Sequence, residues 1–156
     1  CRYCEEQRCY YSDHVCKTKK SGAQYARDFA EILKNPDIES FGAYEKKLVA
    51  KTKLISINYR GRAYHIGKFI IVVHLNGAYT EFKNLSQLPK NACSDHPHIQ
   101  SAAPCFGNLH DSIKELEAQR DYPSLFGLYI EFLKSYNREG RYVQITAWPS
   151  TPIRKR

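Results

Sequence analysis

Methionine is absent from this chain of 156 residues, which begins with a cysteine. Translation starts at methionine, so we expect that a preceding segment was removed, and a secretory signal peptide cleaved before Cys1 is the simplest explanation. Artificial truncation is the alternative, but it leaves the lack of internal methionine unexplained. Four of the six cysteines lie within the first sixteen positions, and this even, clustered set predicts disulfide bonds formed in an oxidising compartment. The expected location is therefore extracellular.

Long hydrophobic runs are also missing. The longest apolar stretch, Phe69 to Val73, has the length of a strand and falls far short of the ~20 residues that a membrane-spanning helix needs. The sequence therefore predicts no transmembrane segment. The composition, 42% hydrophobic and 26% charged, is typical of a globular protein, and the length favours a single domain.

Acidic residues are scarce in the middle of the chain. Between Lys46 and Lys90 the only acidic residue is Glu81, and this segment carries the whole net charge of +8. Its nine basic residues are Lys46, Lys47, Lys51, Lys53, Arg60, Arg62, Lys68, Lys83 and Lys90. Such segregation predicts a basic surface for an anionic partner: a sulfated glycan, an acidic protein patch, nucleic acid or a membrane surface.

The cysteines predict covalent cross-links. Cys93 and Cys105 share one proline-containing loop, and a bridge between them would add about 3 kcal/mol of stability. The pairing of the other four, Cys1, Cys4, Cys9 and Cys16, stays open. A zinc site built from Cys1, Cys4, His14 and Cys16 is the alternative. It lacks the second cysteine pair typical of zinc motifs, so we predict no metal.

Hydrophobic periodicity predicts helices on both sides of a group of strands. A capping box at Ser21 and Gln24 begins a helix that ends at Asn35-Pro36. Residues 37–51 fit either a short helix or an early strand. Later helices are predicted to follow Asn108 and the Asp121-Tyr122-Pro123 sequence, and a final strand is predicted from Tyr142 to Trp148.

Alternating residues predict strands over residues 55–60, 69–75 and 78–82. Asn76-Gly77 is the preferred turn dipeptide of a hairpin. A two-residue turn predicts Val73–Thr80 and Ile71–Phe82 pairs on the core face. On the opposite face it predicts the pairs His74–Tyr79, Val72–Glu81 and Ile70–Lys83. The order of elements predicts an α+β fold in which a curved antiparallel sheet of about four strands packs against helices. The predicted divisions are a disulfide-stapled, cysteine-rich arm (1–20), one domain (21–148) and a basic tail (149–156).

The strand face opposite the core is the predicted binding surface. If the final strand joins the hairpin, Tyr142 and Trp148 lie beside His74 and Tyr79, and an aromatic face then adjoins the basic region. The predicted binding residues are Lys46, Lys47, Lys51, Lys53, Arg60, Arg62, Lys68, His74, Tyr79, Tyr142 and Trp148. An equally open alternative is that a helix covers this face and makes it a second core layer.

Two other functions compete with binding. An RNase-like hydrolase would need two imidazoles, or an imidazole and a carboxylate, around a phosphate. The candidates are His65, His74, His96, His98 and His110. A carrier of a small apolar ligand would need a cavity lined by Tyr79, Tyr142 and Trp148.

The function that the sequence favours is therefore binding without catalysis and without a cofactor. We expect a secreted module that recognises an extracellular protein or a sulfated glycan, with heparin binding as the simplest test. Asn84-Leu85-Ser86 is an N-glycosylation sequon, so a glycan is predicted on Asn84.

Overall fold

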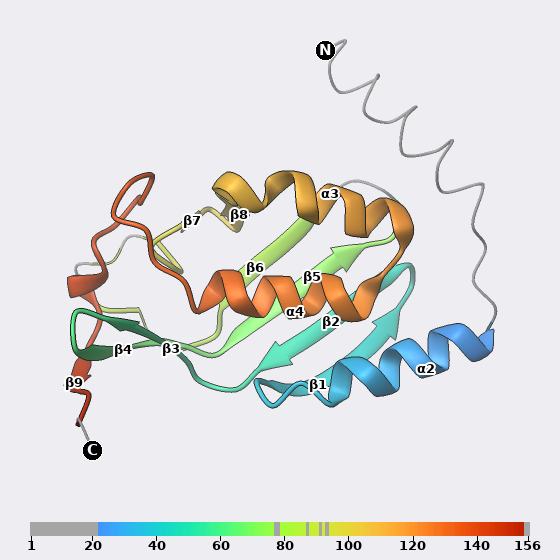
Figure 1. Ribbon diagram of the computed structural model, residues 1–156, viewed down its shortest axis with the longest axis horizontal. Coiled ribbons are helices and arrows are strands. Elements are labelled where there is room, and N and C mark those ends of the chain that lie inside the picture. Colours follow the sequence, from blue (N-terminus) through green and yellow to red (C-terminus); the bar gives the residue numbers. More distant parts are fainter. Residues whose placement is uncertain (1–21, 77–78, 87, 91, 93, 155–156) are drawn as a thin grey trace, which may run out of the picture.

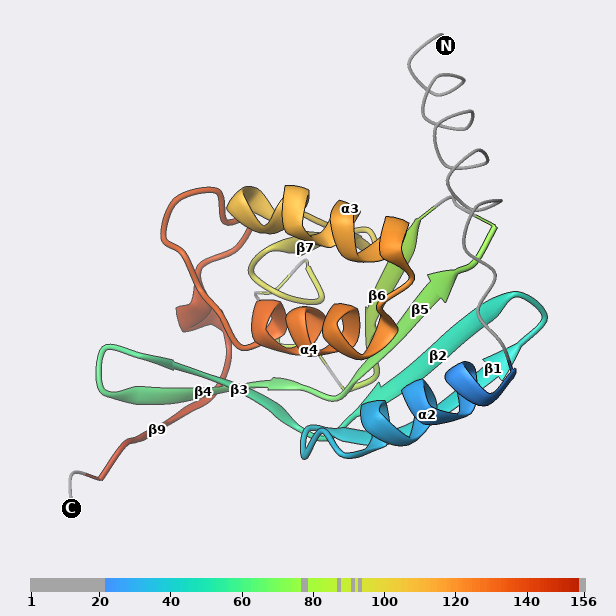
Figure 2. The ribbon, with the colours of Figure 1, turned by 45° about the vertical axis from the view of Figure 1, so that its right-hand side comes forward.

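A four-stranded antiparallel sheet with helices on one side forms the centre of the computed structural model, which describes residues 22–76, 79–86, 88–90, 92 and 94–154. The order of the strands in this sheet, sheet A, is β1-β2-β5-β6. Figure 1 shows α2, α3 and α4 on the same side of the sheet, and Figure 2 shows the same layering from another angle. The predicted α+β class and the sheet of about four strands are confirmed. The cysteine-rich arm lies outside the described residues.

Helix α2 (Gly22–Leu33) begins where the capping box predicts and ends before Asn35-Pro36. Beyond its end, the Asn35 side chain accepts a hydrogen bond from the Asp37 backbone amide at 3.0 Å. The aromatic rings of Tyr25 and Phe29 lie on the inner side of the helix, and Phe29 contacts Phe41 of β1 at 5.0 Å between ring centroids. This apolar side holds α2 against the sheet.

The ambiguous segment after α2 forms two strands, β1 (Ile38–Tyr44) and β2 (Lys47–Thr52). The turn between them places Glu45 and Lys46 at φ values of 40° and 64°, so the chain reverses within two residues. Leu48 and Ala50 of β2 are buried, whereas Lys47 and Lys51 are exposed. This alternation is typical of a strand with one buried face, but it extends over only the six residues of β2, which is why the sequence alone was ambiguous.

The central hairpin of β5 (Phe69–His74) and β6 (Thr80–Asn84) has the predicted register. Val73 pairs with Thr80, Ile71 with Phe82, Val72 with Glu81 and Ile70 with Lys83. The His74 amide donates to the Tyr79 carbonyl, as the remaining predicted pair requires. Residues 77–78 of the turn lie outside the described residues. Strand β2 pairs with β5, so the hairpin completes sheet A.

A second, three-stranded sheet extends from one end of sheet A. Sheet B consists of β3 (Ile55–Tyr59), β4 (Arg62–Gly67) and β9 (Ser150–Pro152), in the order β3-β4-β9. Figure 1 shows its hairpin reaching away from the helices, with the C-terminal strand beside it. Residues predicted as a basic tail thus extend the fold through Pro152.

The predicted strand from Tyr142 to Trp148 is wrong. Part of this segment forms the 3-10 turn η2 (Ile145–Ala147), in which the Trp148 amide donates to the Ile145 carbonyl. Ile145 and Trp148 are both buried. Their spacing of three residues is that of one 3-10 turn, so the apolar alternation of this short segment does not mark a strand.

Helix α4 (Tyr122–Leu133) lies across the middle of sheet A and is the most deeply buried helix described. The Asp121 side chain caps its first turn by accepting from the Ser124 amide. Phe126 and Tyr129 are fully buried, and the ring of Tyr129 contacts Phe82 of β6 at 5.1 Å. These contacts make the helix-facing side of sheet A the core of the protein.

Helix α3 (His110–Gln119) follows a 3-10 turn, η1 (Gly107–Leu109), with no side-chain cap. The loop before it contains the two-residue strands β7 (Ile99–Gln100) and β8 (Ala103–Pro104). Ile113 of α3 is buried. The predicted helix after Asn108 is thus present, and it begins one residue later than predicted, with Leu109 in place of Asn108 as the N-cap.

Candidate functional site on the open side of sheet A

The side of sheet A opposite the described helices carries no described element. We call it the open face. From β1 to β6 its residues form three rows: Tyr44, Lys47, His74 and Tyr79; Gly42, Val49, Val72 and Glu81; Ser40, Lys51, Ile70 and Lys83. Neighbouring strands lie about 4.8 Å apart, so each row brings its side chains into contact distance. The sequence left open whether this face was covered, bare or hollow; within the described residues it is bare.

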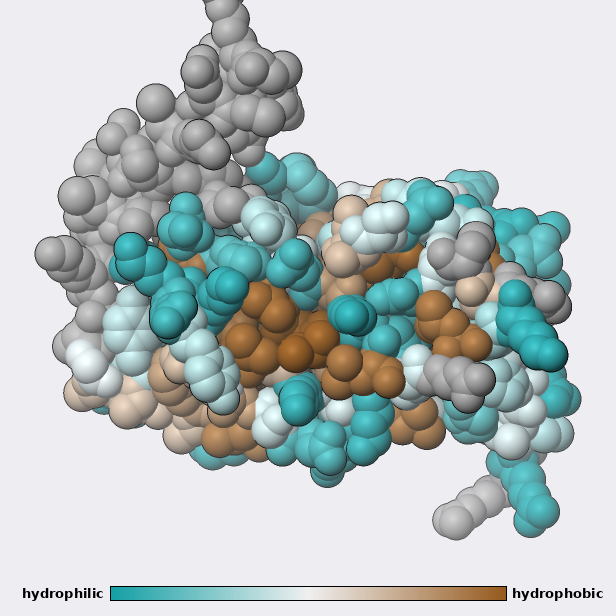
Figure 3. Space-filling view, turned by 180° about the vertical axis from the view of Figure 1, so that it is seen from behind, coloured by the Kyte–Doolittle hydropathy of each residue, from teal (hydrophilic) through white to brown (hydrophobic). Residues whose placement is uncertain are grey.

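An apolar strip occupies the middle of the open face. Val49, Ile70 and Val72 are half-buried there, although they face away from the core. Tyr44 extends the strip: a Cβ atom on Gly42 would lie 2.9 Å from its ring, so the ring rests over the glycine. Figure 3 shows this side as an apolar (brown) patch bordered by hydrophilic (teal) side chains. Hydrophobic area gathered in this way, within a polar rim, is typical of a docking surface.

His74 and its neighbours form the polar corner of the open face. Its Nε2 atom lies 3.0 Å from a carboxylate oxygen of Glu81. Its ring lies 4.5 Å from the ring of Tyr79, at an interplanar angle of 32°. The Tyr79 side chain covers the imidazole and is itself 58% exposed. Tyr79 and Tyr44 (64% exposed) thus stand at opposite edges of the face as aromatic groups available to a partner.

The basic residues divide into two groups, where the sequence predicted one region. Lys47, Lys51 and Lys83 rise from the open face around the apolar strip. Lys46 and Lys53 lie in the turns that flank β2, and Lys68 forms a 3.5 Å ion pair with Glu39 at the border of the sheet. The two arginines among the predicted binding residues lie elsewhere: Arg62 is in β4 of sheet B, and Arg60 is in the turn between β3 and β4.

Tyr142 and Trp148 do not join the open face, because the strand that would place them there is absent. Trp148 is only 3% exposed, and its indole nitrogen has no hydrogen-bond partner among the described residues. Tyr142 is exposed, and its amide donates to the Pro97 carbonyl at 2.7 Å. The residues that complete the face are instead Tyr44, Val49, Ile70, Val72 and Lys83. The predicted hairpin register already contained three of them.

The histidines proposed for catalysis are held in separate structural roles. His96 is fully buried: Nε2 donates to the Leu133 carbonyl at 2.8 Å, and Nδ1 accepts from the His98 amide. Burial lowers the pKa of His96 to about 3. Burial also lowers the pKa of His98, whose Nε2 accepts from the Asn137 amide. Both imidazoles are therefore neutral, and their hydrogen bonds connect the loop before β7 to the end of α4 and to the segment that follows this helix.

The other histidines lie on different elements. His65, in sheet B, contacts the Ser56 hydroxyl at 3.0 Å and the Thr151 hydroxyl at 3.1 Å. His110 is exposed at the start of α3, and His74 lies on the open face. Because His96 and His98 are buried and hydrogen-bonded, they do not join the other histidines in one site. The one described imidazole–carboxylate pair among the candidates within 3.0 Å is His74 with Glu81, on the open face. Within the described residues no three His, Cys, Asp or Glu side chains gather as a metal site.

Asn84, the predicted glycosylation site, is 7% exposed and fully hydrogen-bonded. Its amide nitrogen donates to the carbonyls of Ile66 and Asp95, and its oxygen accepts from the Ser86 amide. A glycan would have to replace one of these buried donors. This placement speaks against modification of the folded chain, and it gives Asn84 a role in joining β4, β6 and the loop near Asp95.

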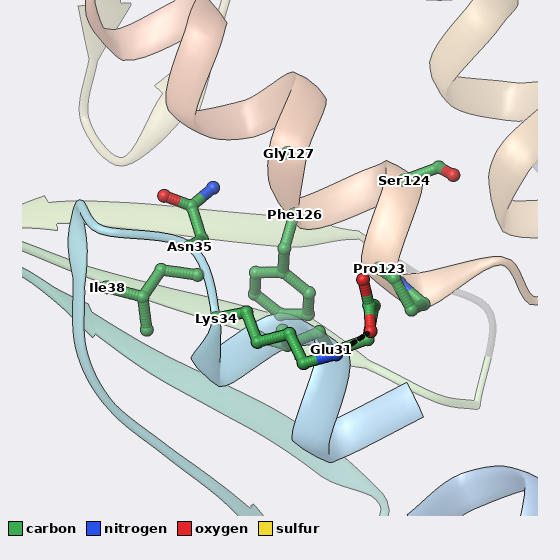
Figure 4. Close-up of a pocket in the computed structure, with 9 residues that line it drawn as sticks. Glu31, Lys34, Asn35, Ile38, Pro123, Ser124, Phe126 and Gly127 are labelled. Carbon is green, nitrogen blue, oxygen red and sulfur yellow. Dashed lines mark hydrogen bonds and ion pairs between the residues drawn. The ribbon is translucent and has the colours of Figure 1, made fainter. Parts of the chain in front are cut away.

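One cleft lies between the end of α2 and the start of α4, with a volume of about 410 Å³. Figure 4 shows the Glu31–Lys34 ion pair at its rim, near Pro123, and Ile38 and Phe126 further in. The cleft is open to solvent and lies on the helical side. It contains none of the residues predicted for an apolar-ligand cavity, and sheet A is not closed around a cavity.

The remaining predictions concern covalent bonds and membranes. Cys105 is exposed, whereas Cys93 and the four N-terminal cysteines lie outside the described residues. The Cys93–Cys105 bridge therefore stays a prediction. Among the described residues, no helix has the length and hydrophobicity to cross a membrane. Comparisons with protein-family models, with curated proteins and with solved structures found no match.

Proposed function

We propose that this protein is a non-catalytic binding module that docks an acidic protein on the open face of sheet A. The single observation that supports this most strongly is the exposed apolar strip of Val49, Ile70, Val72 and the Tyr44 ring within a border of lysines. A solvent-facing strand surface needs no apolar centre to fold, because antiparallel sheets tolerate polar residues on their outer side.

The chemistry of the partner follows from the arrangement of charge. Lys47 and Lys51 lie on opposite sides of Val49 along β2, and Lys83 adds a third cation across the sheet. The one carboxylate of the face, Glu81, is engaged by His74. A protein with a small apolar patch and carboxylates around it would be complementary in both respects. A sulfated glycan would use the lysines but would leave the apolar strip in water, so the geometry favours a protein.

The expected extracellular setting and the disulfide-stapled arm belong to the same proposal. They rest on cysteines outside the described residues. The docking surface depends on neither of them, because its residues could bind a partner in an oxidising or in a reducing compartment.

Photo-cross-linking tests the proposal. A benzoylphenylalanine at position Val72 should form a cross-link to a partner protein, whereas the same residue at exposed Ser112 of α3 should not. The linked peptide, identified by mass spectrometry, should contain carboxylates beside apolar residues.

With the purified partner, Lys51→Glu should weaken binding about tenfold. Lys90→Glu, which changes the net charge equally at a loop outside the face, should leave it nearly unchanged. Equal effects of the two substitutions, or cross-linking only through position 112, would contradict the proposal.

A further inference from the structure

Sheet B and the turns around it contain basic residues without any acidic counterpart. Residues 54–67 and 149–156 include no Asp or Glu. Among the described residues of this region, the exposed arginines are Arg60, Arg62 and Arg154. We call them the arginine cluster. On the open face of sheet A, by contrast, Glu81 and the nearby Glu39 accompany the lysines.

The fold brings the cluster together from distant parts of the sequence. Strand β9 pairs with β4 so that Pro152 lies opposite Arg62. The Ile153 amide then donates to the Gly61 carbonyl at 2.9 Å, which sets the following residue, Arg154, beside the β3–β4 turn. Figure 2 shows the C-terminal strand running alongside this hairpin, away from the helices.

Two of the three guanidinium groups are held in place. Arg62 donates from Nε to the Ser150 hydroxyl at 2.8 Å and also donates to the Ser150 carbonyl, which leaves other N–H groups of the fork available. Arg60 lies at φ 48° in the turn, with its guanidinium carbon 5.1 Å from the centre of the Tyr59 ring. Held in this way, the two lose less conformational freedom on binding than free side chains would.

We propose that the arginine cluster is a second binding surface, separate from the open face, that takes the sulfate groups of a sulfated polysaccharide. The parallel N–H donors of a guanidinium fork can bind two oxygens of one sulfate or phosphate group. Residues 54–67 and 149–156 contribute no carboxylate that would repel a polyanion.

The cluster also offers a reason to prefer a glycan over nucleic acid. Single-stranded nucleic acids are held by bases stacked on open aromatic rings as well as by cations. The aromatic ring of this patch, Tyr59, has Arg60 over one face and the Tyr136 ring packed against it at 4.8 Å and 82°. Tyr59 therefore provides no free platform for a base.

Binding of a size-defined heparin oligosaccharide tests this inference. The double variant Arg60→Asn/Arg154→Ser keeps Arg62, which is bonded to Ser150, and Asn tolerates the left-handed turn position. We expect its affinity at physiological salt to fall about tenfold and the salt dependence to lose a slope of about two. The matched control, Lys47→Ser/Lys51→Ser, removes the same charge from the open face and should have little effect.

Equal losses in the two double variants would overturn the inference, because binding would then follow net charge. The inference would also be overturned, in favour of nucleic acid, if single-stranded RNA displaced the bound heparin more strongly than free heparin of equal charge does. Urea unfolding midpoints of both variants verify that each is folded. Neither outcome bears on the docking of an acidic protein, which is measured with the single substitution Lys51→Glu.

Discussion

Two adjacent isoleucines of β5 allow the open face to be tested by stability alone. Ile71 is fully buried and pairs with Ala50 and Phe82, whereas Ile70 is half-buried on the open face between Lys51 and Lys83. Both substitutions to alanine remove the same atoms from the same central strand, so the loss of strand propensity, up to about 1 kcal/mol, is common to both. Only the burial of the side chain differs.

The expected difference is large enough to measure. Ile71→Ala should lower the free energy of unfolding by about 3–4 kcal/mol, since it removes buried methyl groups and leaves a cavity. Ile70→Ala should lower it by about 1 kcal/mol. With a urea m value of about 2 kcal/mol/M, the unfolding midpoints of the two variants should differ by about 1 M. Equal midpoints would mean that Ile70 is as fully covered as Ile71, and the reasoning that this side of the sheet is bare would be wrong.

Three further predictions concern His96, Gly67 and the Cys93–Cys105 pair. Because burial holds the pKa of His96 near 3, below the unfolded value of 6.5, the folded state should lose stability as the pH falls: about 2 kcal/mol between pH 6.5 and 5. Urea titrations at several pH values should show that the free energy of unfolding of His96→Asn depends less on pH than that of the wild-type protein. An unchanged pH dependence would contradict the prediction. Gly67→Ala should destabilise the protein by about 3 kcal/mol or more in the same assay. Its Cβ would lie 2.3 Å from the Asn84 amide oxygen, at φ 145°, and would displace that hydrogen-bonded side chain; a loss below 1 kcal/mol would refute the argument. A non-reducing peptide map should join Cys93 to Cys105, whereas iodoacetamide labelling of Cys105 in unreduced protein would exclude the bridge.

The central hairpin is the part of the fold that the sequence determines best. The β5–β6 register follows from strand alternation and a two-residue turn, and a shift of one residue would move Ile71 and Phe82 out of the core. Helix α4 is predicted equally well from the sequence, because its cap and its proline mark its start and its mostly apolar circumference indicates a buried helix. In both cases a local signal and burial favour the same structure.

The candidate site could be predicted only in part, because it depends on which strands become neighbours. His74, Tyr79 and Lys47 were expected from the sequence, but Tyr44 and Val49 reach the open face only through the pairing of β1 and β2, where the local pattern was ambiguous. The separation of Arg60 and Arg62 from the lysines likewise requires sheet B, whose third strand comes from the far end of the chain. Alternation alone also misplaced Trp148, because the 3-10 turn buries Ile145 and Trp148, which would lie on opposite faces of a strand.

Methyl NMR offers the most direct test of the claim that the open face of sheet A is the docking surface. The protein would be labelled at valine and isoleucine methyl groups and titrated with the purified partner identified by cross-linking. We expect the methyl resonances of Val49, Ile70 and Val72 to shift most, while those of their buried neighbours Ile71 and Val73 shift little. Perturbations concentrated in the helical layer, with the three open-face residues unchanged, would contradict it.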